Sequence, residues 1–231
     1  MEASLFTALN WQPILLSVKL AVVTTVCLLI IATPVAYVLS FYKFRGKALV
    51  EAVFALPLVL PPTVLGFFVL VIVGNMSPVG RWYSEIFGGT MAFSFTGIVV
   101  ASILYSFPFA VQPIQNAFQS INPRYIDAAR TLGCNRWQTF WRVLVPGARA
   151  GLVTGAILSF AHTVGEFGVV LMVGGSIPGK TKVASIAIYE NVEILNYAEA
   201  TVMSIVMLLF SFVIMSGVYY YNRSTNKLVF N

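Results

Sequence analysis

Charged residues are scarce in this sequence. Asp, Glu, Lys and Arg together make up 10% of its 231 residues, whereas a soluble domain usually carries about 25%. Such a chain cannot cover its surface with solvated side chains, so the composition excludes an ordinary soluble protein. Hydrophobic residues make up 58% of the sequence, and its mean hydropathy is +0.86. We therefore predict an integral membrane protein.

Residues that bind metals or form disulfides are also few. The sequence holds one histidine, His162, and two cysteines. Cys27 lies in an apolar run and Cys134 in a polar segment, so we expect neither a disulfide nor a His/Cys metal site, and no cofactor. No Gly-x-x-x-x-Gly-Lys-Ser/Thr loop is present to hold a nucleotide phosphate. We expect a non-catalytic chain.

Long apolar runs occupy most of the sequence. About 20 apolar residues in a helix cross a bilayer core of roughly 30 Å, which predicts an all-α membrane protein of about five transmembrane helices. The spans leave no room for a catalytic domain, so we expect one transmembrane domain over residues 1–231. The first run is too long for a signal peptide and has no basic residue ahead of it. The predicted spans are Ile14–Tyr42, Ala48–Val73, Phe93–Phe118, Ala150–Val173 and Tyr197–Tyr221.

The basic residues predict the orientation. The formal net charge of +6 does not indicate a nucleic-acid partner, because these residues sit between the apolar runs. Lys and Arg concentrate on the cytoplasmic side of membrane proteins. One side of the five spans holds ten of them and the other holds only Arg81, Lys180 and Lys182, so we expect an N-terminus outside and a C-terminus in the cytoplasm. The ten are Lys43, Arg45, Lys47, Arg124, Arg130, Arg136, Arg142, Arg149, Arg223 and Lys227.

Helix breakers lie within or beside the predicted spans. The segment from Leu56 to Pro62 contains Pro57, Pro61 and Pro62, which rules out a regular helix there. Ordinary kinking explains such prolines most simply, and the opening of a central path is the other interpretation. Gly151 and Gly155 form a small-xxx-small pair that permits close helix packing.

The polar segment from Ile121 to Arg149 is too long for a plain connector. Asn122 suits a helix N-cap, Pro123 the first helical position and Gly133 a C-terminal stop. One face of this helix is small and apolar, and a second short helix is expected from Asn135. Two interpretations stay open: an interfacial helix on the lipid, or a docking site for a cytoplasmic partner. The residues of the apolar face are Tyr125, Ala128, Ala129 and Leu132.

Within this segment, one spaced motif resembles the "EAA" loop of ABC-importer permeases. Asp127-Ala128-Ala129 is followed after three residues by Gly133, and after nine more by Val143-Leu144-Val145-Pro146. The departures from the family pattern are mild: Asp for Glu and Val for Ile and Leu. Together with the segment from Leu56 to Pro62 and with Gly165-Glu166-Phe167-Gly168, the chain is most similar to molybdate permeases, which have close relatives among sulfate and tungstate permeases.

The resemblance carries several expectations. It implies a type I ABC importer permease in a bacterial inner membrane, with a second copy of the chain, two cytoplasmic ATPase subunits and an extracytoplasmic oxyanion-binding protein as partners. It also implies that the loop is a coupling helix seated on the ATPase. The alternatives are a sulfate or tungstate permease, an ATP-independent secondary transporter, or an assembly subunit of a membrane enzyme. The coupling residues would be Asp127, Ala128, Ala129, Gly133 and Pro146.

Polar residues inside the spans are candidates for the pathway or its gate. They are Lys19, Ser159, His162, Thr163 and Glu166. Lys19 is the one basic residue within a span, so we expect a dianion to be guided by backbone and hydroxyl donors. Lys19 and Glu166 lie at matching depths with opposite charges, which predicts an ion pair; alternatively, Lys19 reaches the outer interface and Glu166 bonds to backbone.

Overall fold

The structure, a computed structural model, describes the backbone of residues 10–227 and the side chains of residues 10–217. Within that part of the chain every regular element is a helix, which confirms the predicted all-α class. The end of the last predicted span, residues 218–221, and the cations Arg223 and Lys227 have side chains outside the described part. The elements are α2 (Gln12–Phe41), α3 (Lys47–Ala55), η1 (Leu56–Leu58), α4 (Pro62–Val73), α5 (Pro78–Phe87), α6 (Phe95–Ser120), α7 (Pro123–Thr131), α8 (Arg136–Thr139), η2 (Phe140–Leu144), α9 (Val145–Gly147), α10 (Arg149–Val164), α11 (Gly168–Gly174), α12 (Ala184–Glu193) and α13 (Tyr197–Lys227).

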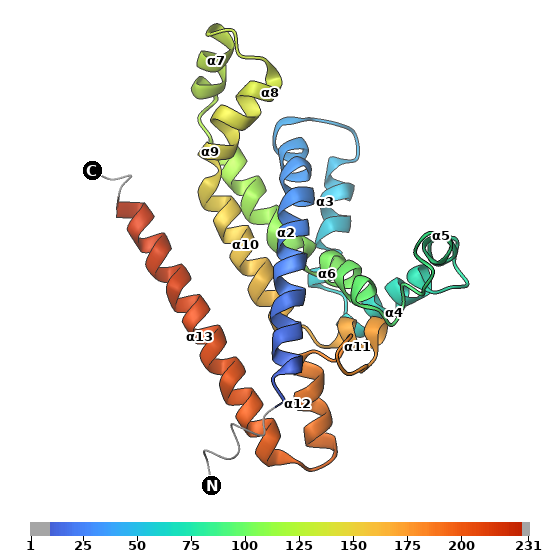
Figure 1. The fold of residues 1–231 in the computed structure, drawn as a ribbon. Coiled ribbons are helices and arrows are strands. Elements are labelled where there is room, and N and C mark those ends of the chain that lie inside the picture. The colour runs from blue at the N-terminus through green and yellow to red at the C-terminus, as the bar shows by residue number, and fades with distance from the viewer. Residues whose placement is uncertain (1–9, 228–231) are drawn as a thin grey trace. The chain divides into compact units, whose positions relative to one another are not determined.

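Among the described residues, three unbroken helices are long and apolar enough to cross a membrane: α2, α6 and the Tyr197–Gly217 part of α13 (Figure 1). Two bent pairs supply up to two more spans. One pair joins Lys47–Leu58 to Pro62–Val73, and the other joins Arg136–Gly147 to Arg149–Val164. The prediction of about five spans therefore corresponds to three continuous helices and two broken ones.

The chain between α3 and α4 breaks where the sequence places its prolines. The α-helix gives way to the 3-10 turn η1, and Pro61 is extended, with φ −54° and ψ 135°. A residue that precedes a proline is forced out of the helical region by the proline ring, and Pro62 follows Pro61 directly. Pro62 then starts α4 at the one helical position where a missing N–H costs nothing.

The fourth predicted span, Ala150–Val173, is not one helix. Helix α10 ends at Val164, and α11 begins only at Gly168. Gly165 and Gly168 flank the break, and glycine lowers the stability of a helix interior. The hydropathy of the segment did not reveal this break, because apolar residues continue on both sides of it.

By its internal contacts the chain divides into two compact units, one of which comprises Thr24–Leu60 and Ile103–His162. Its core joins α2, α6 and the Leu144–Ala148 segment ahead of α10 through a mixture of small and large side chains. Gly151 of α10 lies against the Pro113 carbonyl and the Ala117 side chain of α6, so the predicted close packing at this glycine is confirmed. The buried core residues are Leu28, Ala32, Ala36, Leu39, Ala110, Val111, Ile114, Phe118, Leu144 and Ala148.

The other unit comprises Met1–Val23, Pro61–Ser102 and Thr163–Asn231. In it, α4 packs on α11 at Gly66, where an added Cβ would lie 2.8 Å from the Met172 Cβ. A second cluster joins Ile14 of α2 to Ala184 and Ala187 of α12 and Met203 of α13.

The packing at Gly151 leads to a test of this core. We expect Gly151→Ala to lower the thermal unfolding midpoint of the detergent-solubilised protein, by an overpacking cost of about 1–3 kcal/mol. The matched control is Gly217→Ala, because Gly217 also lies in a helix but has nothing within 4 Å of its added Cβ. Both changes gain the same helix propensity, so equal midpoints for the two variants would contradict the close packing of α6 on α10.

Candidate coupling loop and pathway residues

Helix α7 is defined by its two ends. The side chain of Asn122 accepts a hydrogen bond from the Arg124 N–H at 3.0 Å, and Pro123 occupies the first turn. At the other end Gly133 adopts φ +79°, in the left-handed region, and its N–H donates to the Arg130 carbonyl at 2.9 Å. Glycine takes this conformation without steric cost, which is why it ends so many helices. The predicted cap and stop of this helix are confirmed.

The predicted apolar face of α7 is largely uncovered. Ala129 is buried, whereas Tyr125 is 67% exposed and Leu132 is 83% exposed. Asp127 and Ala128 are exposed as well. Exposed apolar surface of this kind is typical of a surface that a partner covers.

The second half of the 121–149 loop starts as predicted and then departs from a regular helix. Asn135 and Gln138 form a reciprocal capping box ahead of α8. The chain then widens into the π-helical turn η2, and α9 carries Pro146. Proline cannot donate the hydrogen bond that an α-helix requires, and π-turns often accommodate such a loss. The segments Arg136–Gly147 and Arg149–Val164 meet at a bend of 68°.

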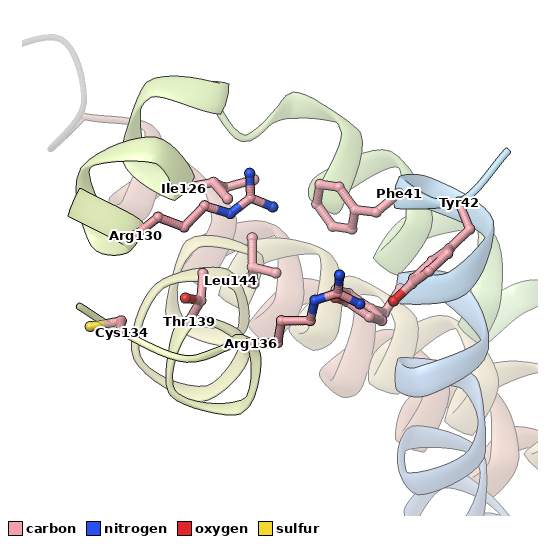
Figure 2. A pocket seen from close by; sticks show the side chains of 9 residues that line it. Phe41, Tyr42, Ile126, Arg130, Cys134, Arg136, Thr139 and Leu144 are labelled. Atoms are coloured by element: carbon pink, nitrogen blue, oxygen red, sulfur yellow. The ribbon is translucent and has the colours of Figure 1, made fainter. Parts of the chain in front are cut away.

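A cavity of about 290 Å³ lies between this loop and the C-terminal end of α2 (Figure 2). We call it the basic cavity, because the side chains of Arg130 and Arg136 both point into it. In the sequence alone, these arginines are only markers of orientation. Their convergence depends on the turn at Gly133, which reverses the chain between them. Its lining residues are Tyr37, Phe41, Tyr42, Ile126, Arg130, Cys134, Arg136, Thr139 and Leu144.

Two of the predicted pathway residues, Ser159 and His162, lie in α10 and have different surroundings. The ring of His162 shares a hydrogen bond of 2.9 Å between its Nδ1 and the Ser106 hydroxyl, and it stacks on Phe109 at 4.1 Å between ring centroids. Ser159 is fully buried and donates its hydroxyl proton to the Gly155 carbonyl at 2.7 Å. Ser106 was missed from the sequence, although a serine inside an apolar span is a usable signal.

Glu166 does not lie in α10 with Ser159 and His162. It lies two residues beyond the end of α10, in the break before α11, and its carbonyl accepts a hydrogen bond from the Ser185 hydroxyl. Its side chain is 3% exposed. The carboxyl lies beside the Ser102 hydroxyl, but within the described residues no partner reaches either oxygen at normal hydrogen-bond geometry. Thr163, in the last turn of α10, is buried too.

The predicted ion pair between Lys19 and Glu166 is absent from the described part of the structure, whose ion pairs join other residues. The Lys19 ammonium lies over the ring of Phe95 instead, 4.7 Å from its centroid. The prediction matched the two depths by assuming that both residues lie on unbroken helices. Glu166 lies outside the helix, so the assumption fails.

Metal chemistry finds no support in the described residues, among which no three His, Cys, Asp or Glu side chains are grouped as a metal site requires. The polar groups at hand are hydroxyls, one imidazole and one carboxyl. They can bind and release a solute by hydrogen bonds.

A family model described as "Binding-protein-dependent transport system inner membrane component" matches residues 29–227. The chain is 50% identical over 204 residues to the molybdenum transport system permease protein ModB of Azotobacter vinelandii, covering 88% of this chain and 90% of the relative. It is 36% identical over 186 residues to the sulfate transport system permease protein CysT of Synechocystis sp., covering 80% of this chain and 65% of the relative.

The fold is also similar to that of a solved transporter. A chain in the crystal structure of a bacterial alginate ABC transporter, in complex with alginate pentasaccharide-bound periplasmic protein, aligns with a TM-score of 0.76. The alignment covers 97% of this chain and 82% of that one, at 18% sequence identity. At this identity the similarity concerns the fold alone.

The hydrogen bond between His162 and Ser106 leads to a prediction. Ser106→Ala leaves a part-buried ring nitrogen without this partner, so we expect a stability loss of about 1 kcal/mol, measured by thermal unfolding in detergent. The control is Thr24→Val, since the buried Thr24 hydroxyl lacks a hydrogen-bond partner in the described residues and its removal should be neutral or stabilising. A Ser106→Ala variant as stable as the control would show that the bond contributes nothing.

Proposed function

This chain belongs to the family of inner membrane components of binding-protein-dependent transport systems, and on that premise we propose that it is the permease subunit of an ATP-driven importer of molybdate. The observation that carries the proposal is the 50% identity to a molybdenum transport permease over most of both chains. The sulfate permease relative is less similar and is longer than the matched region. Sulfate or tungstate import is therefore the second candidate.

The 121–149 loop is proposed as the contact to the ATPase. In support, α7 holds the Asp127-Ala128-Ala129 stretch between a capped start and a glycine stop. Its small apolar face is exposed in the single chain, with Leu132 at its end. Pro146 closes the loop at the bend that leads into α10. A helix packed against an ATPase here would pass its displacement to α10, and alternating access requires two such arrangements.

The partners follow from the same family. An inner membrane component needs a cytoplasmic ATPase to supply energy and a binding protein to deliver solute. The similar alginate transporter was crystallised with a periplasmic protein. We propose the same kinds of partner here, together with a second copy of this chain, which would line the other half of the path.

The orientation is proposed from charge. The loop that would meet the ATPase carries five of the ten basic residues on its side: Arg124, Arg130, Arg136, Arg142 and Arg149. Because cytoplasmic loops are enriched in Lys and Arg, the loop would face the cytoplasm and the N-terminus the outside.

The solute path is proposed to use hydroxyls rather than fixed cations. Ser159, Thr163 and the Ser106–His162 pair supply polar groups in α6 and α10. The ammonium of Lys19 already lies over an aromatic ring. An ionised Glu166 would repel an anion, which suits a gate or a packing element. Weak sites let a conducting path release its cargo, so affinity would reside in the binding protein.

The function is tested in proteoliposomes that hold this permease, its ATPase and its binding protein. We expect ATP-dependent accumulation of labelled molybdate, with tungstate competing better than sulfate. Accumulation without ATP would indicate a secondary transporter and overturn the proposal. Accumulation of labelled sulfate or tungstate in preference to molybdate would favour the second candidate instead.

Gly133 provides the test of the coupling loop. Gly133→Val places a β-branched residue in the left-handed region, at a cost of about 1–3 kcal/mol, and should abolish uptake while the protein still inserts. Gly133→Asn should keep most uptake, because asparagine tolerates this conformation. The matched control is Gly46→Val, which strains a glycine at φ +86° in equally open space outside the loop. Normal coupling of ATP hydrolysis in Gly133→Val would refute the role of the loop.

A further inference from the structure

Two hollows adjoin at the base of the 121–149 loop, both within the unit that holds α7 and α8. The first is the basic cavity. The second is an open groove of about 620 Å³ between the middle of α2 and the α8–α10 segment, which we call the apolar groove. Three side chains line both hollows: Tyr37, Tyr42 and Arg136. The hollows are therefore adjacent and share a wall, with the arginines on one side and the apolar side chains on the other.

The cationic end suits a phosphate. Arg130 and Arg136 point toward the same space (Figure 2), and the residues that line the cavity include no Asp or Glu. Arg130 also contacts Asp127 at 3.7 Å, but both side chains are more than two-thirds exposed. Such exposed pairs contribute little to stability, so the guanidinium can turn to an anion without a large loss. Arginine binds phosphate with paired N–H groups.

The apolar end suits a hydrocarbon chain. Apart from Thr33 and the three shared residues, the groove is lined by apolar side chains. Ile30, Trp137 and Trp141 are 68%, 69% and 52% exposed. Tryptophans are enriched at the interface between water and membrane, so their exposure here suits contact with lipid. The rings of Trp137 and Trp141 lie 5.6 Å apart at their centroids and form one wall. The remaining lining residues are Leu29, Pro34, Phe140, Val145 and Leu152.

We propose that the basic cavity and the apolar groove together bind one anionic phospholipid, with its phosphate between Arg130 and Arg136 and an acyl chain along Ile30, Trp137 and Trp141. Two features identify the occupant: the charge complementarity between the arginines and a phosphate, and the adjacency of the basic cavity and the apolar groove. A free oxyanion would leave the groove uncovered. An apolar helix from a second copy would cover Arg136 without supplying a counter-charge, and burying an unpaired charge is costly.

The bound lipid would brace α2 against the loop. Tyr37 of α2 already packs edge-on against Phe140 of η2, with centroids 5.2 Å apart. A phosphate between the arginines would add a charged contact on the other side of that ring pair. If the loop meets the ATPase, as proposed above, anionic lipid would then stiffen the element that transmits motion. This consequence rests on the proposed function, whereas the binding site does not.

The test measures lipid binding directly. The permease–ATPase complex is placed in nanodiscs with equal amounts of phosphatidylglycerol and phosphatidylcholine, released, and weighed by native mass spectrometry. We expect preferential retention of phosphatidylglycerol, reduced about fivefold in Arg136→Gln, the contribution of one basic residue beside an anionic membrane. Arg142→Gln is the matched control, since Arg142 is exposed on the same loop but lines neither hollow.

A second variant tests the apolar end. Ile30→Ser, at an exposed position that should not disturb folding, is expected to reduce the retention of phosphatidylglycerol as well. Equal retention of the two lipids, or equal loss in Arg136→Gln and Arg142→Gln, would overturn the proposal. So would Arg136-dependent binding of inorganic phosphate to the lipid-free complex that Ile30→Ser leaves unchanged, because the site would then take a free anion. None of these outcomes depends on transport, so they are separate from a failure of the proposed function.

Discussion

The need to satisfy backbone polar groups where helices break in apolar surroundings governs this structure. A carbonyl or N–H without a partner in such a setting costs several kcal/mol. After α11 the chain turns on Thr181, whose buried hydroxyl donates to the Gly174 carbonyl at 2.7 Å and accepts from the Ile177 N–H at 3.1 Å. The Ser185 hydroxyl does the same for the carbonyl of Glu166. Side chains thus replace the hydrogen bonds that the broken helices cannot make, and these replacements fix where the chain can turn.

The same constraint explains how a hydroxyl ties the start of α2 to α12. Ser17 donates to the Pro13 carbonyl, one turn back, and accepts the Ala184 N–H at 2.8 Å. Ala184 is the first residue of α12, so its N–H has no partner within that helix. A single serine satisfies two segments that are 167 residues apart. Replacing Ser17 with any apolar residue would leave the Ala184 N–H at the start of α12 without this partner. The same change would raise the hydropathy of α2.

The sequence allowed the prediction of those features that local chemistry decides. The limits of α7 follow from Asn122, Pro123 and Gly133, because capping depends on the residue itself and on its nearest neighbours. The break at Leu56–Pro62 follows from proline geometry. The break after Val164 was missed, since it depends on Gly165, Gly168 and a hydroxyl from a distant residue. The basic cavity was missed for a similar reason: Arg130 and Arg136 are six positions apart, and only the reversal at Gly133 turns both toward α2.

The distribution of charge completes the physical picture of a transport subunit. Within the three continuous candidate spans, α2, α6 and residues 197–217 of α13, Lys19 is the one basic side chain, and it is exposed beside Phe95 rather than buried in a polar site. The arginines instead gather on the 121–149 loop, where water and lipid headgroups can solvate them. A deep cation would hold a dianion too strongly to release it, because attraction between charges rises steeply as water is excluded. Under the proposal that hydroxyl groups such as that of Ser159 contact the solute, the contacts are weaker and can be made and broken as the helices move. A permease built in this way needs a separate protein to capture its solute and a separate motor to drive the change, which is the division of labour of its family.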